Sequence, residues 1–319
     1  MNTCAKGNIN NMDISFFSSL PAMNEDLKQF KKTRIAPTPS GYLHLGNIYS
    51  FSLTAALAEK TGAKILLRID DLDRDRVNND YVQDIFDTLD FMQIPWHEGP
   101  KNLIEFDREY SQLQRMPLYE EALAKLSEIE AIFACNCSRS QIRLSSADDA
   151  YPGTCRHKNL SLYAKDACLR LKTDERLGLS VETLTKGQQK ALLPAAMKDF
   201  VVQKKDGYPA YQLASVIDDI HFGVDLIVRG QDLWNSTLAQ LYLSQKLGVA
   251  EFQKATFHHH PLLTEKTGIK LSKSAGDTSI RYLRQYGLKP TDIYNNIGRM
   301  LGFKEPADNW QKLASLSLK

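Results

Sequence analysis

His44-Leu45-Gly46-Asn47 is the first of two segments whose residue types could bind phosphate groups. Pro37 and Pro39 precede it and keep the chain extended, because proline is excluded from a helix interior. The segment opens an apolar run that ends near Gly62, as a helix would. We therefore predict a turn that leads into a helix N-terminus, where unpaired backbone N–H groups favour an anion. His44 would add a side-chain donor, and Gly46 would leave room for a flat ligand.

The second segment, Lys270 to Gly276, is polar and doubly basic. Lys273 could stabilise the charge that develops on transferring phosphates, and Ser272 and Ser274 add hydroxyl donors. Taken separately, the two segments are typical of an ordinary strand-turn-helix and of a solvated loop. Their occurrence in one chain favours a nucleotide site.

Three of the five cysteines fall close together with a tyrosine. The group Cys135, Cys137, Tyr151 and Cys155 spans 21 residues, and Cys4 and Cys168 fall outside it. An odd number of cysteines does not indicate a disulfide framework. Three sulfurs and one harder oxygen suit a tetrahedral structural Zn²⁺. Buried free thiols are the alternative, and His157 is a lower-ranked substitute for one ligand.

A parallel sheet with crossover helices is predicted to position the first segment. Lys64 to Asp70 is a short apolar run that ends in carboxylates, as expected for a buried strand. A helix from about Asn78 to Pro95 follows, which gives a β-α-β-α order over the first hundred residues. Ligands of such sheets bind at the carboxyl ends of the strands, so the proline-rich turn and Asp70 should share one edge.

The pattern in the rest of the chain is less regular. A helix is predicted over 107–130 with a kink at Pro117, a loop over 134–160, and no periodic element over 161–195. The remaining predictions are strands over 200–204 and 210–213 around a turn at 205–208, a strand over 224–229, a helix over 236–247, and about 45 mostly helical residues at the C-terminal end.

The composition describes a soluble globular protein. Of the 319 residues, 43% are hydrophobic and 24% are charged, and the net charge of +2 leaves any nucleic-acid surface to a local basic patch. No apolar run is long enough for a membrane span, and residues 1–30 lack the features of a secretory signal. We expect a cytoplasmic protein.

Together the motifs resemble class I aminoacyl-tRNA synthetases of the glutamyl type. In that family the first segment is the "HIGH" box and Lys270 to Ser274 is the "KMSKS" loop. Five blocks in the family's order carry the resemblance: the Arg34 to Asn47 stretch, Leu67 to Asp73, Val216 to Val224, Ile227 to Leu233, and His259 to Leu262 with the Lys270 to Ser274 loop beyond it.

The resemblance implies a Rossmann-type catalytic domain that joins an amino acid to ATP and releases pyrophosphate, with Mg²⁺ on the phosphates. His44 and Lys273 would stabilise the in-line transition state. The implied ATP-binding residues are His44, Gly46, Asn47, Asp232, Lys270 and Lys273. The implied glutamate-binding residues are Arg34, Ile35, Ala36, Pro37, Thr38, Asp70, Tyr211 and Arg229.

Within that set, Arg34 and the backbone through Thr38 would hold the substrate carboxylate, and Asp70 would accept from the α-ammonium. Tyr211 would shape the pocket, and Arg229 would meet the distal carboxylate. The family's His-His-Pro falls in the triple histidine 258–260, which we expect to order the nucleotide loop or contact ATP rather than bind a metal. The alternative for Arg229 is a strand-end arginine paired with a nearby acid.

Two departures concern the amino acid. The glutamyl type usually has Glu and Ser where this chain has Asp70 and Thr38, and the glutaminyl sister enzymes do carry Asp. Arg229 favours glutamate, because a neutral amide would leave its charge buried and unpaired.

The cysteine group, including the tyrosine ligand, is similar to the zinc site of a shortened branch, the glutamyl-queuosine tRNA(Asp) synthetases. A full glutamyl-tRNA synthetase continues about two hundred residues past its KMSKS loop, whereas this chain has 45 residues after Ser274. The implied reaction is transfer of L-glutamate to queuosine in the anticodon arm of tRNA(Asp), by a monomer. The alternatives are a truncated glutamyl- or glutaminyl-tRNA synthetase that charges a 3′ end, and an inactive synthetase-like binding protein.

The expected domain organisation places the insertion between two halves of the sheet. The predicted ranges are an N-terminal extension over 1–30, a first Rossmann half over 31–105, a zinc-bearing insertion over 106–196, a second Rossmann half over 197–263, and the KMSKS-type loop with a short helical segment and no anticodon-binding domain over 264–319.

Overall fold

The computed structural model describes residues 28–145, 150–264 and 279–319. Its first unit is the strand β1 (Lys32–Ile35), the helix α1 (Leu45–Thr61) and the strand β2 (Lys64–Leu67), with β1 and β2 parallel. Gly62 ends α1 in the left-handed conformation, with φ 74°. The helix α2 (Asn79–Phe91) follows, capped by the Asn78 side chain. The predicted β-α-β-α order is confirmed.

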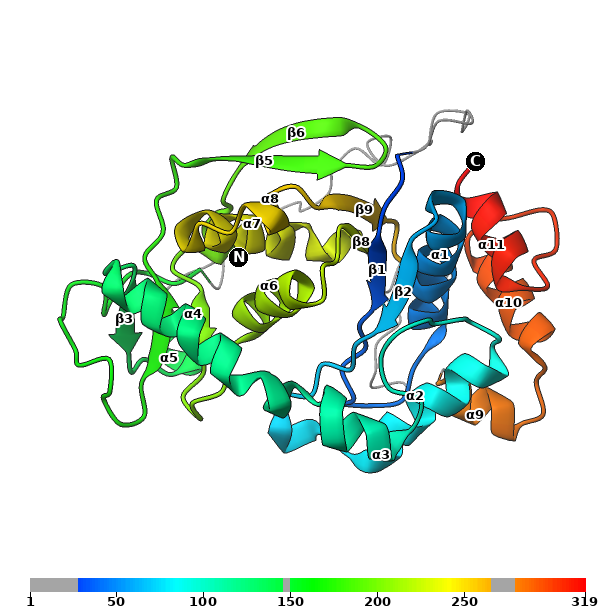
Figure 1. Cartoon of the computed structure of the whole chain (residues 1–319), viewed down its shortest axis with the longest axis horizontal. Helices are drawn as coiled ribbons and strands as arrows, with labels where there is room; N and C mark the ends of the chain where they lie inside the picture. The colour runs from blue at the N-terminus through cyan, green and yellow to red at the C-terminus, as the bar shows by residue number, and fades with distance from the viewer. Residues whose placement is uncertain (1–27, 146–149, 265–278) are drawn as a thin grey trace, which may run out of the picture.

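A second parallel pair belongs to a separate four-stranded sheet that contacts β1. The strands β8 (Leu226–Gly230) and β9 (Thr256–His260) are parallel, and α7 (Trp234–Leu247) and α8 (Ala250–Gln253) connect them. β8 lies beside β1 (Figure 1), where the Asp225 N–H donates to the Lys32 carbonyl at 3.1 Å and the Asp225 carboxylate accepts from the backbone N–H groups of Lys31 and Lys32. The predicted α/β fold with a parallel sheet is confirmed.

Residues 103–203 contain the largest departures from the sequence predictions. Cys135 ends a strand, β3 (Ile132–Cys135), and the helix α5 (Arg139–Ser145) follows within the predicted loop. β3 forms an antiparallel sheet with β4 (Cys168–Leu171) and β7 (Val201–Gln203). The hairpin of β5 (Gly178–Thr183) and β6 (Gly187–Leu192) extends the parallel sheet through β9. The prediction of no periodic element over 161–195 was therefore wrong.

Two further predictions were wrong for local reasons. Pro117 does not kink a helix over 107–130 but stands in the first turn of α4 (Met116–Glu128), after the short helix α3 (Leu103–Glu105), because proline's missing N–H has no helical partner there. Residues 210–213 are not a strand, because α6 (Tyr211–His221) begins at Tyr211.

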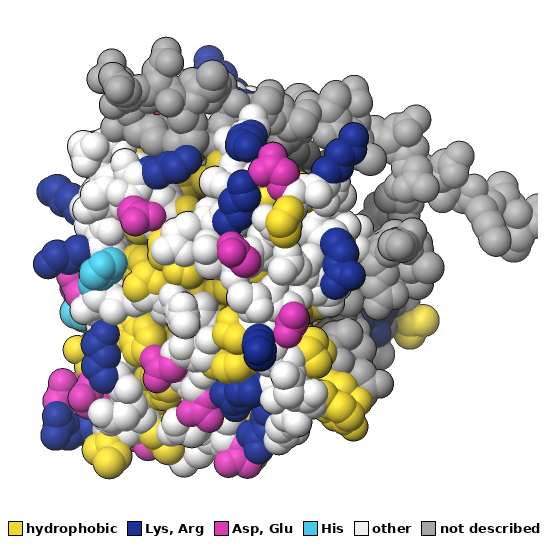
Figure 2. Space-filling model, turned by 90° about the vertical axis from the view of Figure 1, so that its right-hand side faces the viewer, with side chains coloured by type: hydrophobic (Ala, Val, Ile, Leu, Met, Phe, Trp, Pro, Cys, Tyr) yellow, Lys and Arg dark blue, Asp and Glu magenta, His cyan; other side chains and the backbone are white. Residues whose placement is uncertain are grey.

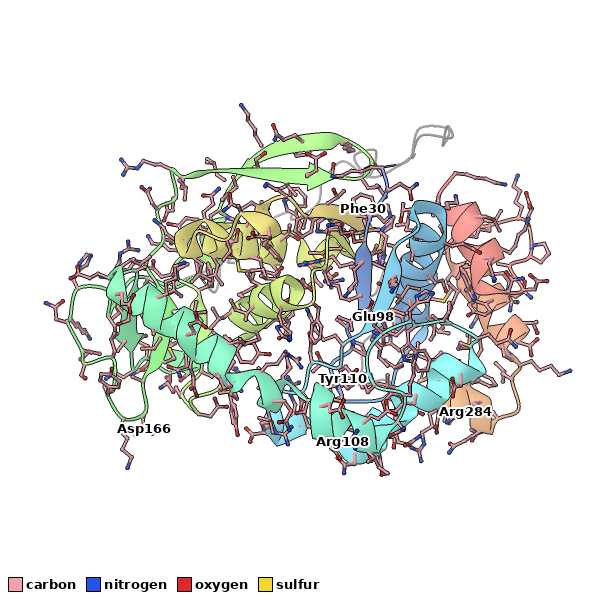
Figure 3. All side chains as sticks on the ribbon, in the orientation of Figure 1. Phe30, Glu98, Arg108, Tyr110, Asp166 and Arg284 are labelled. Atoms are coloured by element: carbon pink, nitrogen blue, oxygen red, sulfur yellow. The ribbon has the colours of Figure 1, made fainter. Side chains whose placement is uncertain are left out.

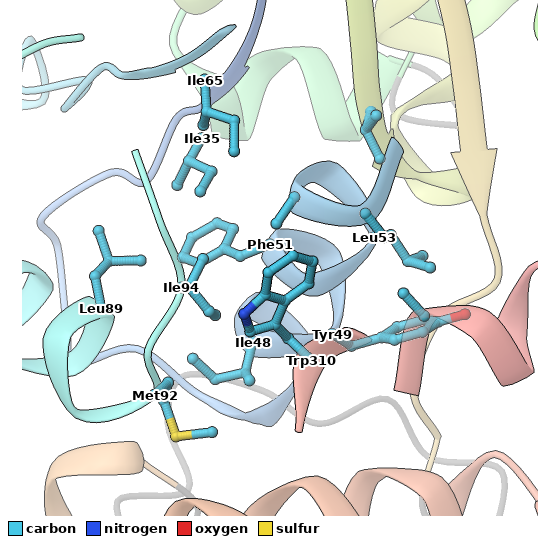
Figure 4. Packing of buried hydrophobic residues seen from close by; sticks show 14 of the residues in the cluster. Ile35, Ile48, Tyr49, Phe51, Leu53, Ile65, Leu89, Met92, Ile94 and Trp310 are labelled. Carbon is cyan, nitrogen blue, oxygen red and sulfur yellow. The ribbon is translucent and has the colours of Figure 1, made fainter. Parts of the chain in front are cut away.

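The described residues at the C-terminal end are mostly helical, as predicted. The helices are α9 (Ile280–Gln285), α10 (Pro290–Met300) and α11 (Trp310–Ser317), and α11 packs along α1. Trp310 lies against α1 beside Ile48 and Tyr49 in the larger apolar core (Figure 4). On this face, basic and acidic side chains are interspersed (Figure 2). None of the described helices is both long and apolar enough to cross a bilayer.

Candidate active site

His44 caps the N-terminus of α1. Its Nδ1 accepts from the Gly46 N–H at 3.1 Å, and the Asn47 side chain accepts from the His44 N–H at 3.0 Å. Because Nδ1 is an acceptor, the neutral ring carries its proton on Nε2. A Cβ on Gly46 would lie 2.9 Å from the His44 ring, so glycine is required for this ring position. Gly46 thus makes room for the histidine itself, a reason that the sequence did not show.

The backbone from Arg34 to Thr38 runs beside the segment that follows β2. The Arg68 N–H donates to the Ile35 carbonyl and the Asp70 N–H to the Pro37 carbonyl, both at 2.9 Å. These bonds continue the β1–β2 pairing and bring the proline-rich turn and Asp70 to the same sheet edge, as predicted.

Arg68 is the centre of a buried ionic network that the sequence analysis did not identify. Its guanidinium donates two hydrogen bonds to the Asp70 carboxylate, from Nε at 2.7 Å and from Nη2 at 3.1 Å. It donates a third from Nη1 to Asp219 at 2.6 Å. Asp219 also accepts from Arg34 Nε at 3.2 Å. Burial raises the pKa of Asp70, while Arg68 opposes this shift. The network fixes the positions of Arg34 and Asp70.

Asp218, the neighbour of Asp219 on α6, links the network to residues 112–119. It accepts from Arg115 Nε at 2.8 Å, Gln112 Nε2 at 2.9 Å and Tyr119 OH at 2.6 Å. These bonds hold the pKa of Asp218 below its usual value despite its burial. The quoted Val216 to Val224 block contained Asp218 and Asp219, but its pattern gave no signal for partners a hundred residues away.

Arg229, near the end of β8, is 3% exposed and has an unusual environment. Its Nη1 donates to Gln240 Oε1 at 2.9 Å, and its guanidinium lies over the Phe257 ring at 5.3 Å. Its Nε and Nη2 have no hydrogen-bond partner, and it makes no ion pair within the described chain. Burial lowers the pKa of Arg229 to about 10. No acid among the described residues pairs with Arg229, which counts against the alternative of a strand-end arginine paired with a nearby acid.

The remaining residues predicted for the site lie near the end of β8, where Arg229 is, or fall outside the described residues. Tyr211 begins α6, is 43% exposed, and is close enough to Arg229 to favour the charged guanidinium. Asp232 is exposed in the turn after β8, and a Cβ on Gly230 would lie 2.6 Å from its Oδ1. Lys270 and Lys273 fall within 265–278, outside the described residues.

The triple histidine forms most of β9, and all three rings are kept uncharged by burial. Burial lowers the pKa of His258 to about 3, of His259 to about 2 and of His260 to about 4. His259 Nε2 bonds Thr237 Oγ1 at 2.8 Å, and His260 Nδ1 donates to the Pro261 carbonyl at 2.9 Å. Among the described residues they belong to no group of three metal-ligand atoms.

The cysteine group brings together side-chain atoms that could hold a metal ion. The sulfurs of Cys135, Cys137 and Cys155 all lie within 4.8 Å of one another, and Tyr151 OH is 3.4 Å from Cys135 Sγ. A tetrahedral zinc site with sulfur ligands at about 2.3 Å needs sulfur separations close to the 3.6 Å found between Cys137 and Cys155. His157 is exposed and outside the group.

Neighbouring side chains contact the cysteine group and affect its charge. The neighbouring side chains of Cys168 and Tyr151 lower the pKa of Cys135 to about 3, which favours the thiolate that a metal binds. Tyr151 OH also accepts from the Cys155 N–H at 2.8 Å, and Arg170 lies over the Tyr151 ring at 3.9 Å. Cys168 donates to the Cys135 carbonyl at 3.3 Å, so it supports the group from outside.

The family model for "tRNA synthetases class I (E and Q), catalytic domain" matches residues 31–310, most of the chain. This chain belongs to that family of class I tRNA synthetases. Membership of this family implies that the chain is a ligase and that it uses ATP.

Two relatives of this synthetase are named Glutamyl-Q tRNA(Asp) synthetase. The protein from Nitratidesulfovibrio vulgaris is 34% identical over 282 residues, which cover 84% of this chain and 86% of the relative. The protein from Verminephrobacter eiseniae is 37% identical over 271 residues, 80% of this chain and 86% of the relative. Glutamate–tRNA ligase 2 from Nitrosococcus oceani is 32% identical over 284 residues, 84% of this chain but 59% of the ligase.

A solved structure has the same fold as this synthetase. The glutamate tRNA ligase of Elizabethkingia meningosepticum, in complex with its amino acid, superimposes with a TM-score of 0.68 at 20% identity. The superposition covers 89% of this chain and 64% of the ligase chain.

Proposed function

We propose that this chain activates L-glutamate with ATP and transfers it to the queuosine base in the anticodon of tRNA(Asp). The family supplies the reaction class, and the two glutamyl-Q relatives, with which the chain shares most of its length, support the acceptor. The amino acid is supported by the charge of the site.

Arg229 is the observation that carries the choice of glutamate. Two of its nitrogens are buried without a hydrogen-bond partner among the described residues, although a charge-assisted bond to a carboxylate would use them. The side-chain carboxylate of glutamate would supply the acceptors and the negative charge that Arg229 lacks among the described residues, whereas the neutral amide of glutamine would leave that charge uncompensated.

The remaining contacts to glutamate follow from the same edge. Arg34 and the backbone through Thr38 would meet the α-carboxylate, and Tyr211 would border the pocket. Asp70 would accept from the α-ammonium, because each carboxylate oxygen bound by Arg68 retains acceptor capacity. The shorter Asp70 is compatible with this role because Arg68 fixes its position.

The nucleotide would lie at the N-terminus of α1. The His44 Nε2–H and the first backbone N–H groups of α1, beside Gly46 and Asn47, would bind the phosphates. Asp232, Lys270 and Lys273 would complete the ATP site. Mg²⁺ on the phosphates would supply charge neutralisation, and the chain's own part is to hold the α-phosphate in line with the glutamate carboxylate.

Zinc would be held by Cys135, Cys137, Cys155 and Tyr151. The ligand set has no open position, so its role would be structural: it would tie the end of β3 to the 151–155 turn.

ATP–pyrophosphate exchange without tRNA tests the amino-acid assignment. We expect exchange with glutamate and on the order of a hundredfold less with glutamine or aspartate. Exchange with glutamine alone would contradict the assignment, and no exchange with any amino acid would instead support an inactive binding protein.

A second candidate is glutamylation of a tRNA 3′ end. The similarity to the Nitrosococcus oceani ligase favours it, although the chain spans 59% of that ligase. The two candidates share the activation step and differ in the acceptor, so a comparison of tRNA(Glu) with tRNA(Asp) separates them.

A further inference from the structure

Gln240, on α7, is the one hydrogen-bond partner that the described chain provides for the Arg229 guanidinium. Its side chain has no exposed area, and its Oε1 accepts from Arg229 Nη1 at 2.9 Å. The opposite contact is the face of the Phe257 ring. Both neighbours hold the guanidinium in place without carrying a charge.

The nearby acids bond other arginines. Asp219 accepts from Arg34 and Arg68 through Oδ1, and Asp70 is held by the Arg68 guanidinium. Asp219 Oδ2 is buried without a hydrogen-bond partner, and neither acid forms an ion pair with Arg229 within the described chain. A glutamate at position 240 would be nearly isosteric with glutamine and would form a buried ion pair with Arg229. The choice of amide over carboxylate at this position therefore decides whether Arg229 keeps an uncompensated charge.

We propose that Gln240 is a specificity-determining residue, which positions Arg229 through a neutral acceptor and so reserves its charge for the substrate's side-chain carboxylate. This inference rests on the proposed activation of glutamate. The uncharged acceptor leaves Arg229 complementary to a side-chain carboxylate and unfavourable for its neutral amide analogue.

Three variants test the inference through ATP–pyrophosphate exchange with glutamate and glutamine. Gln240→Glu adds the neutralising carboxylate, Gln240→Met removes the acceptor without adding charge, and Gln245→Glu adds the same charge elsewhere on α7. Gln245 is the matched control, because it faces a different cavity of about 440 Å³ that Lys28 and Lys254 also line. Thermal unfolding checks that each variant is folded.

We expect Gln240→Glu to lower the ratio of kcat/KM for glutamate over glutamine by on the order of a hundredfold, mainly through a higher KM for glutamate. Its KM for ATP should not change. Gln240→Met should weaken glutamate without improving glutamine, and Gln245→Glu should keep the wild-type ratio.

A wild-type ratio in Gln240→Glu, or an equal loss with both amino acids, would overturn the inference and leave glutamate activation standing. Absence of exchange in the wild-type enzyme would instead contradict the proposed function. Calorimetric titration of each protein with glutamate and with glutamine gives the same comparison for binding alone.

Discussion

Arg229 shows what a single residue's surroundings add to its position in the sequence. Its place at the end of a predicted strand indicated a carboxylate partner, and the resemblance assigned that partner to the substrate. The structure adds two unpartnered nitrogens and a neutral anchor. A buried guanidinium without an acid lowers stability, so this arrangement is expected where a ligand supplies the missing charge.

Replacement of Arg229 should therefore separate activity from stability. In Arg229→Gln we expect KM for glutamate to rise on the order of a hundredfold, while Tm stays the same or increases because an uncompensated buried charge is removed. Exchange kinetics and thermal unfolding measure the two effects. A marked fall in Tm with an unchanged KM would show that Arg229 is structural.

Some residues of the site could be predicted from the sequence, and others could not. Arg34, Asp70 and Arg229 could be chosen from motifs, but the Arg68–Asp219 bond joins residues 151 positions apart. No local periodicity encodes such a pair, since it depends on how α6 packs against the sheet.

Helices and strands with long apolar segments could be predicted from the sequence, whereas polar strands could not. α1, α2 and α7 have clear caps or stops, and β8 is a continuous apolar run. In contrast, β6 (Gly187–Leu192) is mostly exposed and reads Gly-Gln-Gln-Lys-Ala-Leu, so only its pairing with β5 makes it a strand. The 210–213 strand failed because Tyr211 starts a helix without a side-chain cap signal.

β9 should make stability depend on pH. His258, His259 and His260 have pKa values of about 3, 2 and 4 in the folded chain, below the usual 6.5. Below pH 6.5 the unfolded chain binds more protons at these residues, so stability is full above that pH and falls as the pH drops towards 4.

Urea unfolding at pH 7.0, 6.0 and 5.0 checks this expectation. Each histidine should contribute a loss of up to about 1.4 kcal/mol per pH unit. The raised pKa of Asp70 opposes the trend, because a carboxyl with a raised pKa gains relative stability on acidification. Constant stability across this range would contradict the buried, neutral state of β9.

Gly99 lies where the segment that follows α2 packs closely against β2. The Leu67 N–H donates to the carbonyl of Glu98 at 2.9 Å, beside β2 in Figure 3. A Cβ on Gly99, where φ is 97°, would lie 2.2 Å from the Leu67 carbonyl oxygen. We expect Gly99→Ala to lower the free energy of unfolding by about 3 kcal/mol or more.

Gly287→Ala is the matched control for this prediction. Gly287 has a similar φ of 80° but open space around its Cβ position, so only about 1 kcal/mol of backbone strain is expected. Equal losses in the two variants would show that the contact with β2 contributes nothing.

For the whole molecule, contacts between distant segments connect the parallel strands with the antiparallel sheet of β3, β4 and β7. β7 joins β3 and β4, the β5–β6 hairpin joins β9, and the Asp218 network links α6 to α4. The class I fold was predictable from five motif blocks, whereas these contacts were not, because they are made by short polar strands and buried charges.

The zinc content of the purified protein tests whether the cysteine group binds a metal. We expect one zinc per wild-type chain, loss of zinc and a lower Tm in Cys135→Ser, and retained zinc in Cys168→Ser, whose sulfur lies outside the group of three. Elemental analysis of the purified proteins gives the ratio. Zinc retained in Cys135→Ser would contradict the ligand set.

The acceptor of the activated amino acid tests the central proposal most directly. The measurement is transfer of labelled glutamate, with ATP, to tRNA(Asp) with queuosine, to tRNA(Asp) without it, and to tRNA(Glu). The proposed function predicts label on the queuosine-containing tRNA(Asp) alone. Equal labelling of both tRNA(Asp) forms, or labelling of tRNA(Glu), would contradict it.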